Sequence, residues 1–265
     1  LRAAQAAQAA QAGDWSKAKT LTDTAASKEP KDGIQHELAI LKGEIALAQK
    51  DSTNALAAFN TAHVSGGSAR TFFGIARAQY MAKAYPKARE AVDNTLKASP
   101  THAGALTLRA QLLWEMQRDD VAAMKDLAAV LDDKNKKSLG TSELATALTV
   151  KGWIMFARDR AGEARAAFDE AVKVDPRNVS ALVGQGEVLF ADGRYTDASS
   201  RFGEALSKEP GSIAALLGSA KSKVALEQLA DAKTQLQAAR QQAPKDMGIT
   251  LLLAKVEDAL GNKKA

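Results

Sequence analysis

The most constraining feature of this sequence is a fixed spacing of 34 residues between prolines. Pro176, Pro210 and Pro244 follow one another at this interval, and each comes after a segment rich in helix-forming residues. Proline ends a helix because it lacks an N–H and its ring clashes with the preceding turn. A recurring period of this size is typical of a stacked array of small units and not of one closed core.

Three segments of the chain, each of about this length, share a pattern of small and large residues. Each has a small residue in its first half and an Ala-x₃-Phe pair in its second half. Alanine and phenylalanine four residues apart lie on one face of a helix, and a glycine lets the partner helix cross closely. The three sets are Gly43, Ala55 and Phe59; Gly152, Ala164 and Phe168; and Gly186, Ala198 and Phe202.

This pattern resembles the tetratricopeptide repeat family, whose unit reads W-x₂-L-G-x₂-Y…A-x₃-F…P over 34 residues. The resemblance implies an all-α fold, a right-handed superhelical solenoid of antiparallel helix pairs that spans residues 1–265 as a single domain. We expect seven hairpins, followed by a helix over residues 247–261 that caps the last one. The expected hairpins lie at about 1–32, 36–68, 69–102, 103–135, 145–178, 179–212 and 213–246.

The pattern departs from strict periodicity in the middle of the chain. The second helix of the fourth hairpin, 122–131, slips by about one residue, and residues 132–142 exceed the period. Their charged composition predicts a solvated loop. Two further prolines fit the repeat: Pro30 ends the first hairpin, and Pro86 falls in the first turn of a second helix, where its missing N–H costs nothing.

Composition and motifs argue against an enzyme. The formal net charge of +5 comes from 16 Lys+Arg against 14 Asp+Glu in residues 1–132 and 20 against 17 in residues 133–265, so no basic half points to nucleic acid. The chain has no cysteine, and none of its three histidines has the spacing of a metal ligand pair. Gly184-Gln185-Gly186 lies inside an expected helix and lacks the third glycine of a dinucleotide loop. We therefore expect no catalytic residue, cofactor or metal.

The first helices of the pairs carry the candidate binding residues. In the tetratricopeptide family these helices line the concave face, so the resemblance implies a groove for a partner peptide or helix. Six of the thirteen aromatic residues fall on this face, and their polar neighbours make the composition one of interface hot spots. The alternative is that the aromatics pack against the next first helix. The expected partner-binding residues are Phe73, Arg77, Tyr80, Gln111, Trp114, Thr149, Trp153, Phe156, Glu187, Phe190 and Lys221.

The function that this resemblance implies is a protein–protein interaction scaffold. The Gly/Ala-rich repeats look bacterial, which suggests a secretion, envelope export, pilus or motility assembly. Two alternatives stay open: a structural or self-assembling spacer, and a regulatory domain of a larger protein. The chain starts at Leu1 within a helical pattern, so we expect a fragment or a processed chain. No apolar run spans a bilayer. We therefore expect a soluble protein of the bacterial cytoplasm or periplasm that neither binds nucleic acid nor inserts into a membrane.

Overall fold

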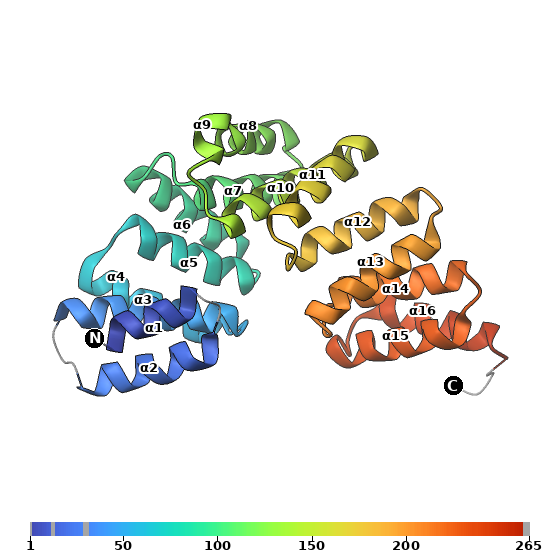
Figure 1. Cartoon of the computed structure of the whole chain (residues 1–265), viewed down its shortest axis with the longest axis horizontal. Coiled ribbons are helices and arrows are strands. Elements are labelled where there is room, and N and C mark those ends of the chain that lie inside the picture. Colours follow the sequence, from blue (N-terminus) through green and yellow to red (C-terminus); the bar gives the residue numbers. More distant parts are fainter. Residues whose placement is uncertain (1, 12–13, 29–31, 262–265) are drawn as a thin grey trace. The chain divides into compact units, whose positions relative to one another are not determined.

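The computed structural model describes residues 2–11, 14–28 and 32–261, and these form helices with no strand among them (Figure 1). The all-α fold expected from the sequence is therefore confirmed. The α-helices are α1 (Arg2–Gln11), α2 (Trp15–Lys28), α3 (Asp32–Ala48), α4 (Ser52–Gly66), α5 (Ala69–Met81), α6 (Tyr85–Ala98), α7 (Ala103–Leu112), α8 (Asp120–Leu131), α9 (Asp133–Lys136), α10 (Thr141–Ala157), α11 (Ala161–Val174), α12 (Val179–Ala191), α13 (Tyr195–Lys208), α14 (Ile213–Ala225), α15 (Leu229–Gln242) and α16 (Met247–Ala259). A π-helix, η1 (Leu113–Gln117), continues α7.

The chain divides into two compact units, Leu1–Val130 and Leu131–Ala265. In both units helices pack in consecutive pairs, for example α3 with α4 and α10 with α11. The first helix of a pair also contacts the first helix of the next pair, as α3 contacts α5 and α12 contacts α14. Each unit therefore has a row of neighbouring first helices. The division falls beside the residues that interrupt the repeat, within what the sequence predicts as a single domain.

The turn inside each hairpin from α3 onward contains one residue with a positive φ. Five of these six residues are not glycine, although the left-handed conformation strains residues that carry a Cβ. The spacing between successive members of this set gives the length of each repeat. Arg118 comes 35 residues after Lys83, and Asp159 comes 41 residues after Arg118. The set is Lys50, Lys83, Arg118, Asp159, Gly193 and Glu227.

The one-residue slip expected in the fourth hairpin is explained by η1. A π-helix bonds each N–H to the carbonyl five residues back and so holds one residue more per turn than an α-helix. The N–H of Arg118 accordingly reaches the carbonyl of Leu113. The extra residue is absorbed within the first helix, before the turn to α8.

The residues beyond the period, 132–142, are not the continuous loop that the sequence predicts. Residues 133–136 form the short helix α9, and α10 begins at Thr141. The carboxylate of Asp132 accepts the N–H of Lys134 at 3.0 Å and caps α9. An acidic first turn and basic residues in the last turn suit the helix dipole. The prediction was wrong here because it weighed the charge of this segment and not its capping pattern.

The prolines lie where the repeat predicts them. Pro86 is in the first turn of α6. Four others come two residues after the end of a second helix, namely Pro100, Pro176, Pro210 and Pro244. Pro30 lies outside the described residues.

The centre of each regular hairpin is a phenylalanine ring held between two glycines. Phe202 of α13 is fully buried, and a Cβ at Gly186 of α12 or at Gly218 of α14 would meet its ring at 2.6 or 2.3 Å. The ring therefore contacts its own first helix and that of the next hairpin at once. The same arrangement joins Phe168 to Gly152 and Gly184, and Phe59 to Gly43 and Gly74.

Where the phenylalanine is absent, the first helix carries alanine instead of glycine. Val92 and Leu236 occupy the phenylalanine position of their hairpins, and Ala76 and Ala220 occupy the glycine position of the first helices. All four side chains are fully buried. Protein interiors pack to a uniform density, so a side chain smaller than phenylalanine requires a smaller space on the facing helix. A smaller side chain on the second helix is thus accompanied by a larger one on the first helix, so the total volume at this contact stays similar.

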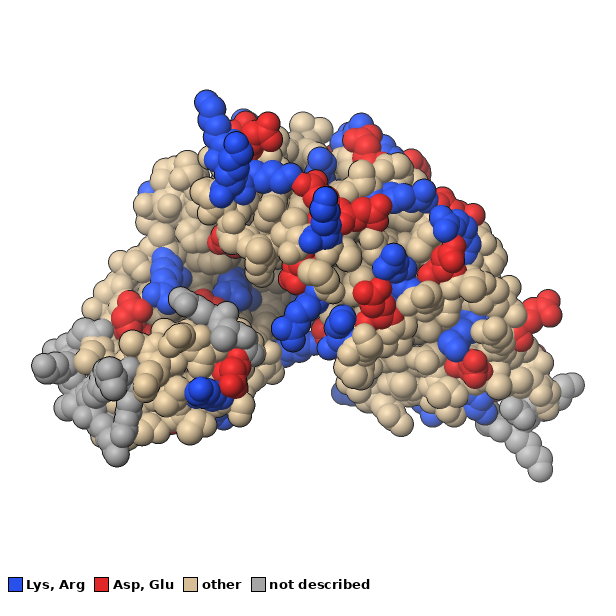
Figure 2. All heavy atoms as spheres, in the orientation of Figure 1, with Lys and Arg blue, Asp and Glu red and all other residues tan. Residues whose placement is uncertain are grey.

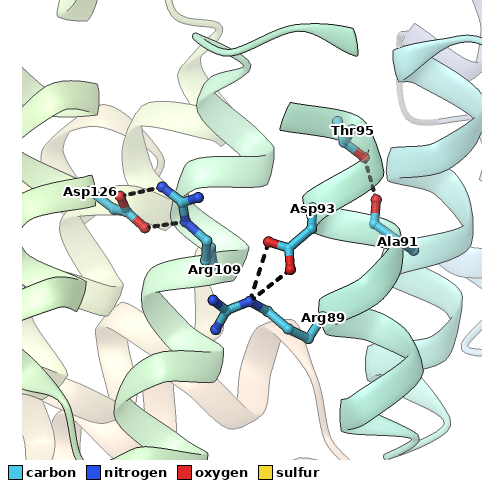
Figure 3. Close-up of polar contacts among 6 residues, drawn as sticks. All are labelled: Arg89, Ala91, Asp93, Thr95, Arg109 and Asp126. Carbon is cyan, nitrogen blue, oxygen red and sulfur yellow. Dashed lines mark hydrogen bonds and ion pairs between the residues drawn. The ribbon is translucent and has the colours of Figure 1, made fainter. Parts of the chain in front are cut away.

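In the fourth hairpin a partly buried ion pair also joins the two helices (Figure 3). The guanidinium of Arg109 in α7 donates two hydrogen bonds of 2.7 Å to the carboxylate of Asp126 in α8. Asp126 is 7% exposed. The hydrogen bond to Asp126 raises the pKa of Arg109, which keeps its guanidinium charged. The pair connects α8 to α7 beside the fully buried Leu127.

Gly218→Ala is expected to destabilise the protein, although alanine is the better helix former. The intrinsic gain is at most about 1 kcal/mol, whereas overpacking a filled site costs about 1–3 kcal/mol. The matched control is Gly203→Ala on α13, where an added Cβ meets nothing within 4 Å. Denaturant unfolding should show Gly203→Ala at or above the wild-type midpoint and Gly218→Ala below it.

Combining Gly218→Ala with Phe202→Leu should restore part of the loss, because the smaller side chain leaves room for the added methyl group. If the two substitutions simply add, the glycine is not required by the ring and the explanation fails.

Candidate protein-binding faces

One position in the first helices gathers polar and aromatic side chains in both units. It is the residue directly after the small position that contacts the second helix. In the first unit, α3, α5 and α7 carry Glu44, Arg77 and Gln111 there. In the second unit, α10, α12 and α14 carry Trp153, Glu187 and Lys221. Because neighbouring first helices are in contact, each set forms a row across its unit.

In the first unit, the charges of this row are paired. Arg77 donates to the carboxylate of Glu44 at 2.7 Å, from one first helix to the next. Its guanidinium also lies 5.8 Å from the ring centre of Phe73, which itself packs against His102 at 4.6 Å. Arg77 and Phe73 therefore lie together, with Glu44 as a partner that the sequence analysis missed.

Tyr80 and Gln111 belong to a second hydrogen-bonded group in the first unit. The phenol of Tyr80 donates to Glu115 of η1 at 2.8 Å, and the amide of Gln111 donates to Glu115 at 3.0 Å and to the phenol oxygen. Burial, followed by the bond to Glu115, raises the pKa of Tyr80 far above its ordinary value. The phenol is therefore neutral and is fixed as a donor.

Two further aromatics and an apolar pocket complete the first unit's face. Trp114 lies beside Arg118, whose guanidinium is 6.0 Å from its ring centre. A pocket of about 440 Å³ opens between α2 and the first helices α3, α5 and α7, and the Arg77–Glu44 pair is part of its lining. Its lining consists of Trp15, Glu44, Leu47, Ala48, Arg77, Tyr80, Met81 and Leu108.

In the second unit, Trp153 both packs and faces outward. Its ring meets the buried ring of Phe168 edge-on at 5.2 Å, and Phe156 lies T-shaped to it at 6.2 Å. Its indole N–H donates to the hydroxyl of Ser180 at 3.1 Å. The side chain is half-buried. Trp153 therefore packs against its neighbours and also keeps part of its side chain exposed, where a partner could contact it.

A mostly apolar pocket of about 480 Å³ lies beside Trp153 in the second unit. Two of its walls are built by residues one helical turn apart, Val183 with Glu187 on α12 and Leu217 with Lys221 on α14. Its other lining residues are Trp153, Val179, Ser180, Glu209, Ser212 and Ala214. It is a concave surface with few polar groups, which is the usual composition of a binding site.

Glu187 is a partly buried carboxylate of the second unit. Burial raises its pKa, and the positive charge of Lys221 offsets part of that rise. Within the described residues no hydrogen bond or ion pair engages Glu187. Lys221 itself is exposed.

Two predicted residues of the second unit are used inside the fold. Thr149 is 4% exposed; its hydroxyl donates to the carbonyl of Ala145 at 2.7 Å and accepts from Asn178 at 3.2 Å. The prediction that Thr149 faces a partner is therefore wrong, because the side chain turns toward α12. Phe190 is half-buried and packs on Tyr195 of α13 at 5.2 Å.

The surface carries mixed charge. Figure 2 shows Lys and Arg interspersed with Asp and Glu on the face in view. Over the described residues, no group of three His, Cys, Asp or Glu side chains is placed to hold a metal ion. None of the described helices has the length and apolar character that crossing a bilayer requires.

Family models described as tetratricopeptide repeat match residues 151–213 and 189–256 of this chain. Residues 151–256, all in the second unit, are therefore tetratricopeptide repeats. The match agrees with the hairpins, the glycine–phenylalanine contacts and the row of first helices described above. Scaffolds of this family are in general not enzymes. No curated protein matches the sequence.

Solved structures share the fold at low sequence identity. A tetratricopeptide repeat protein from Parabacteroides merdae is 19% identical, with a TM-score of 0.64 over 96% of this chain and 97% of that one. Cut9, in its hetero-tetramer with Hcn1, is 12% identical with a TM-score of 0.75 over 95% of this chain and 48% of its own. The type IV pilus biogenesis factor PilW is 22% identical with a TM-score of 0.60 over 74% and 87%. At these identities the likeness concerns the fold alone.

Trp153→Ala should destabilise the protein much less than Phe168→Ala. Phe168 is 0% exposed, and its removal leaves a cavity that costs about 3–5 kcal/mol. Trp153 keeps one side in solvent, so we expect a cost of about 1–2 kcal/mol from its lost ring contacts. Thermal unfolding of the two variants compares these values. Equal losses would show that Trp153 is a core residue and is not available to a partner.

Proposed function

We propose that this chain is a protein–protein interaction scaffold whose first-helix faces bind a segment of another protein. The observation that carries the proposal is the apolar pocket beside Trp153, which is lined by three consecutive first helices. A half-exposed tryptophan next to aliphatic side chains is the composition of an interface hot spot.

The proposed partner segment is an extended peptide or a helix held within a bacterial multiprotein assembly. The Gly/Ala-rich repeats support this proposal, and so does the fold shared with a pilus biogenesis factor. No motif of the chain suggests a reaction, so the proposed role is not enzymatic. The second candidate is a self-assembling spacer, favoured by the exposed Met247 and Leu251 on α16.

Site-specific photocrosslinking tests the proposal in cells of the source organism. A photoreactive phenylalanine analogue at Lys221, which lines the pocket, should crosslink to a different protein. The matched control is the same analogue at Lys208, which is exposed on α13 and lines no pocket described above. Crosslinks to other copies of this chain alone would favour the spacer, and equal crosslinking from both positions would contradict a specific face.

A partner found in this way should bind Trp153→Ala at least about thirtyfold more weakly. Central aromatic anchors cost about 2 kcal/mol or more on truncation, and about 1.4 kcal/mol corresponds to a tenfold change. Calorimetric titration of the folded variant measures this loss. Unchanged affinity would place the partner elsewhere on the chain.

A further inference from the structure

The pocket of the second unit contains a carboxylate without a partner. Glu187 lies at the edge of apolar residues, and burial raises its pKa. No hydrogen bond or ion pair engages it within the described residues. Covering such a group with a neutral partner removes its remaining water and costs free energy, unless the partner supplies a cation or a donor.

The first unit shows the contrasting arrangement at the same repeat position. There Glu44 is paired with Arg77 at 2.7 Å, so the acidic group is already neutralised by its own fold. In the second unit the corresponding neighbour of Glu187 is Lys221, which forms no ion pair within 4 Å with Glu187 and acts on it only at longer range. The carboxylate at this repeat position is therefore paired in the first unit and has no ion pair beside Trp153.

We propose that the pocket beside Trp153 selects an extended protein segment that has an aliphatic residue followed or preceded, two positions away, by lysine or arginine. This inference rests on the proposed function and names the chemistry of its partner. The aliphatic side chain contacts Val183 and Leu217, and the cation pairs with Glu187.

The spacing of the wall residues determines the spacing of the motif. Val183 and Glu187 are four residues apart on α12 and lie one turn apart, at about 5–6 Å. Side chains two positions apart on an extended segment point the same way and lie about 6.6 Å apart, at about 3.3 Å per residue. One such pair therefore reaches the aliphatic wall and the carboxylate together.

The neighbouring positive charge restricts where the cation can lie. Lys221 projects from α14 on the other side of the pocket and repels a second cation there. The partner's basic residue is thus directed away from Lys221 and toward Glu187. Replacing Lys221 removes this repulsion, so Lys221→Gln should bind the same segment more tightly.

Selection from a random twelve-residue peptide library displayed on phage tests the inference on the intact chain. Wild-type protein should enrich peptides with an aliphatic residue and Lys or Arg two positions apart. Synthetic copies of these peptides should bind Glu187→Gln at least about tenfold more weakly. The matched control, Glu90→Gln, removes the same charge from an exposed residue of α6 and should leave the affinity unchanged.

The outcomes separate this inference from the proposed function. Peptides that need Trp153 but carry no basic residue, or that bind Glu187→Gln as well as wild type, overturn the inference and leave the scaffold proposal standing. If no peptide is enriched that loses affinity with Trp153→Ala, both proposals fail.

Discussion

The structure depends on one contact, a phenylalanine ring that fills the space left by glycines on two successive first helices. Phe202 meets Gly186 and Gly218 at distances that allow no additional methyl group. One side chain thus closes its own hairpin and also attaches it to the next. Repeat proteins gain stability from such nearest-neighbour interfaces and not from one shared core. The alanines that accompany Val92 and Leu236 show the same contact built with other volumes.

This contact also sets the spacing of the candidate binding residues. The residue that follows each small position lies on the first helix, so fixing that helix fixes the row it belongs to. The two units then use their rows differently. In the first unit Glu44 and Arg77 neutralise each other, and Glu115 holds Tyr80 and Gln111. In the second unit Trp153 and Glu187 border an apolar pocket, and the carboxylate has no partner of its own. The polar groups of the first unit's face are therefore hydrogen-bonded within the fold, whereas the face of the second unit carries a carboxylate without a partner.

Much of the fold could be predicted from the sequence because each hairpin repeats the same local signals. Proline positions, glycine–phenylalanine pairs and the slip in the fourth hairpin follow from residue types at fixed spacing. Other features depend on contacts that spacing does not encode. Thr149 turns inward because Asn178 caps α12 and donates to it. Glu115, which accepts from Tyr80, lies in η1, whose π-helical form the residue spacing does not indicate. Glu44 could have been found, since it stands one repeat before Arg77 with the opposite charge. The pocket beside Trp153 could not be predicted from spacing alone, because three separate helices line it.

Native-state hydrogen exchange of Phe202→Ala tests the central contact most directly. The ring joins α13 to both α12 and α14, so the free energy of opening should fall for the protected amides of all three helices together. An equal loss in α14 is the decisive part of this result, because α14 belongs to the next hairpin. If the amides of α12 and α13 lose protection while those of α14 keep the wild-type value, the ring does not link successive hairpins and the account is contradicted.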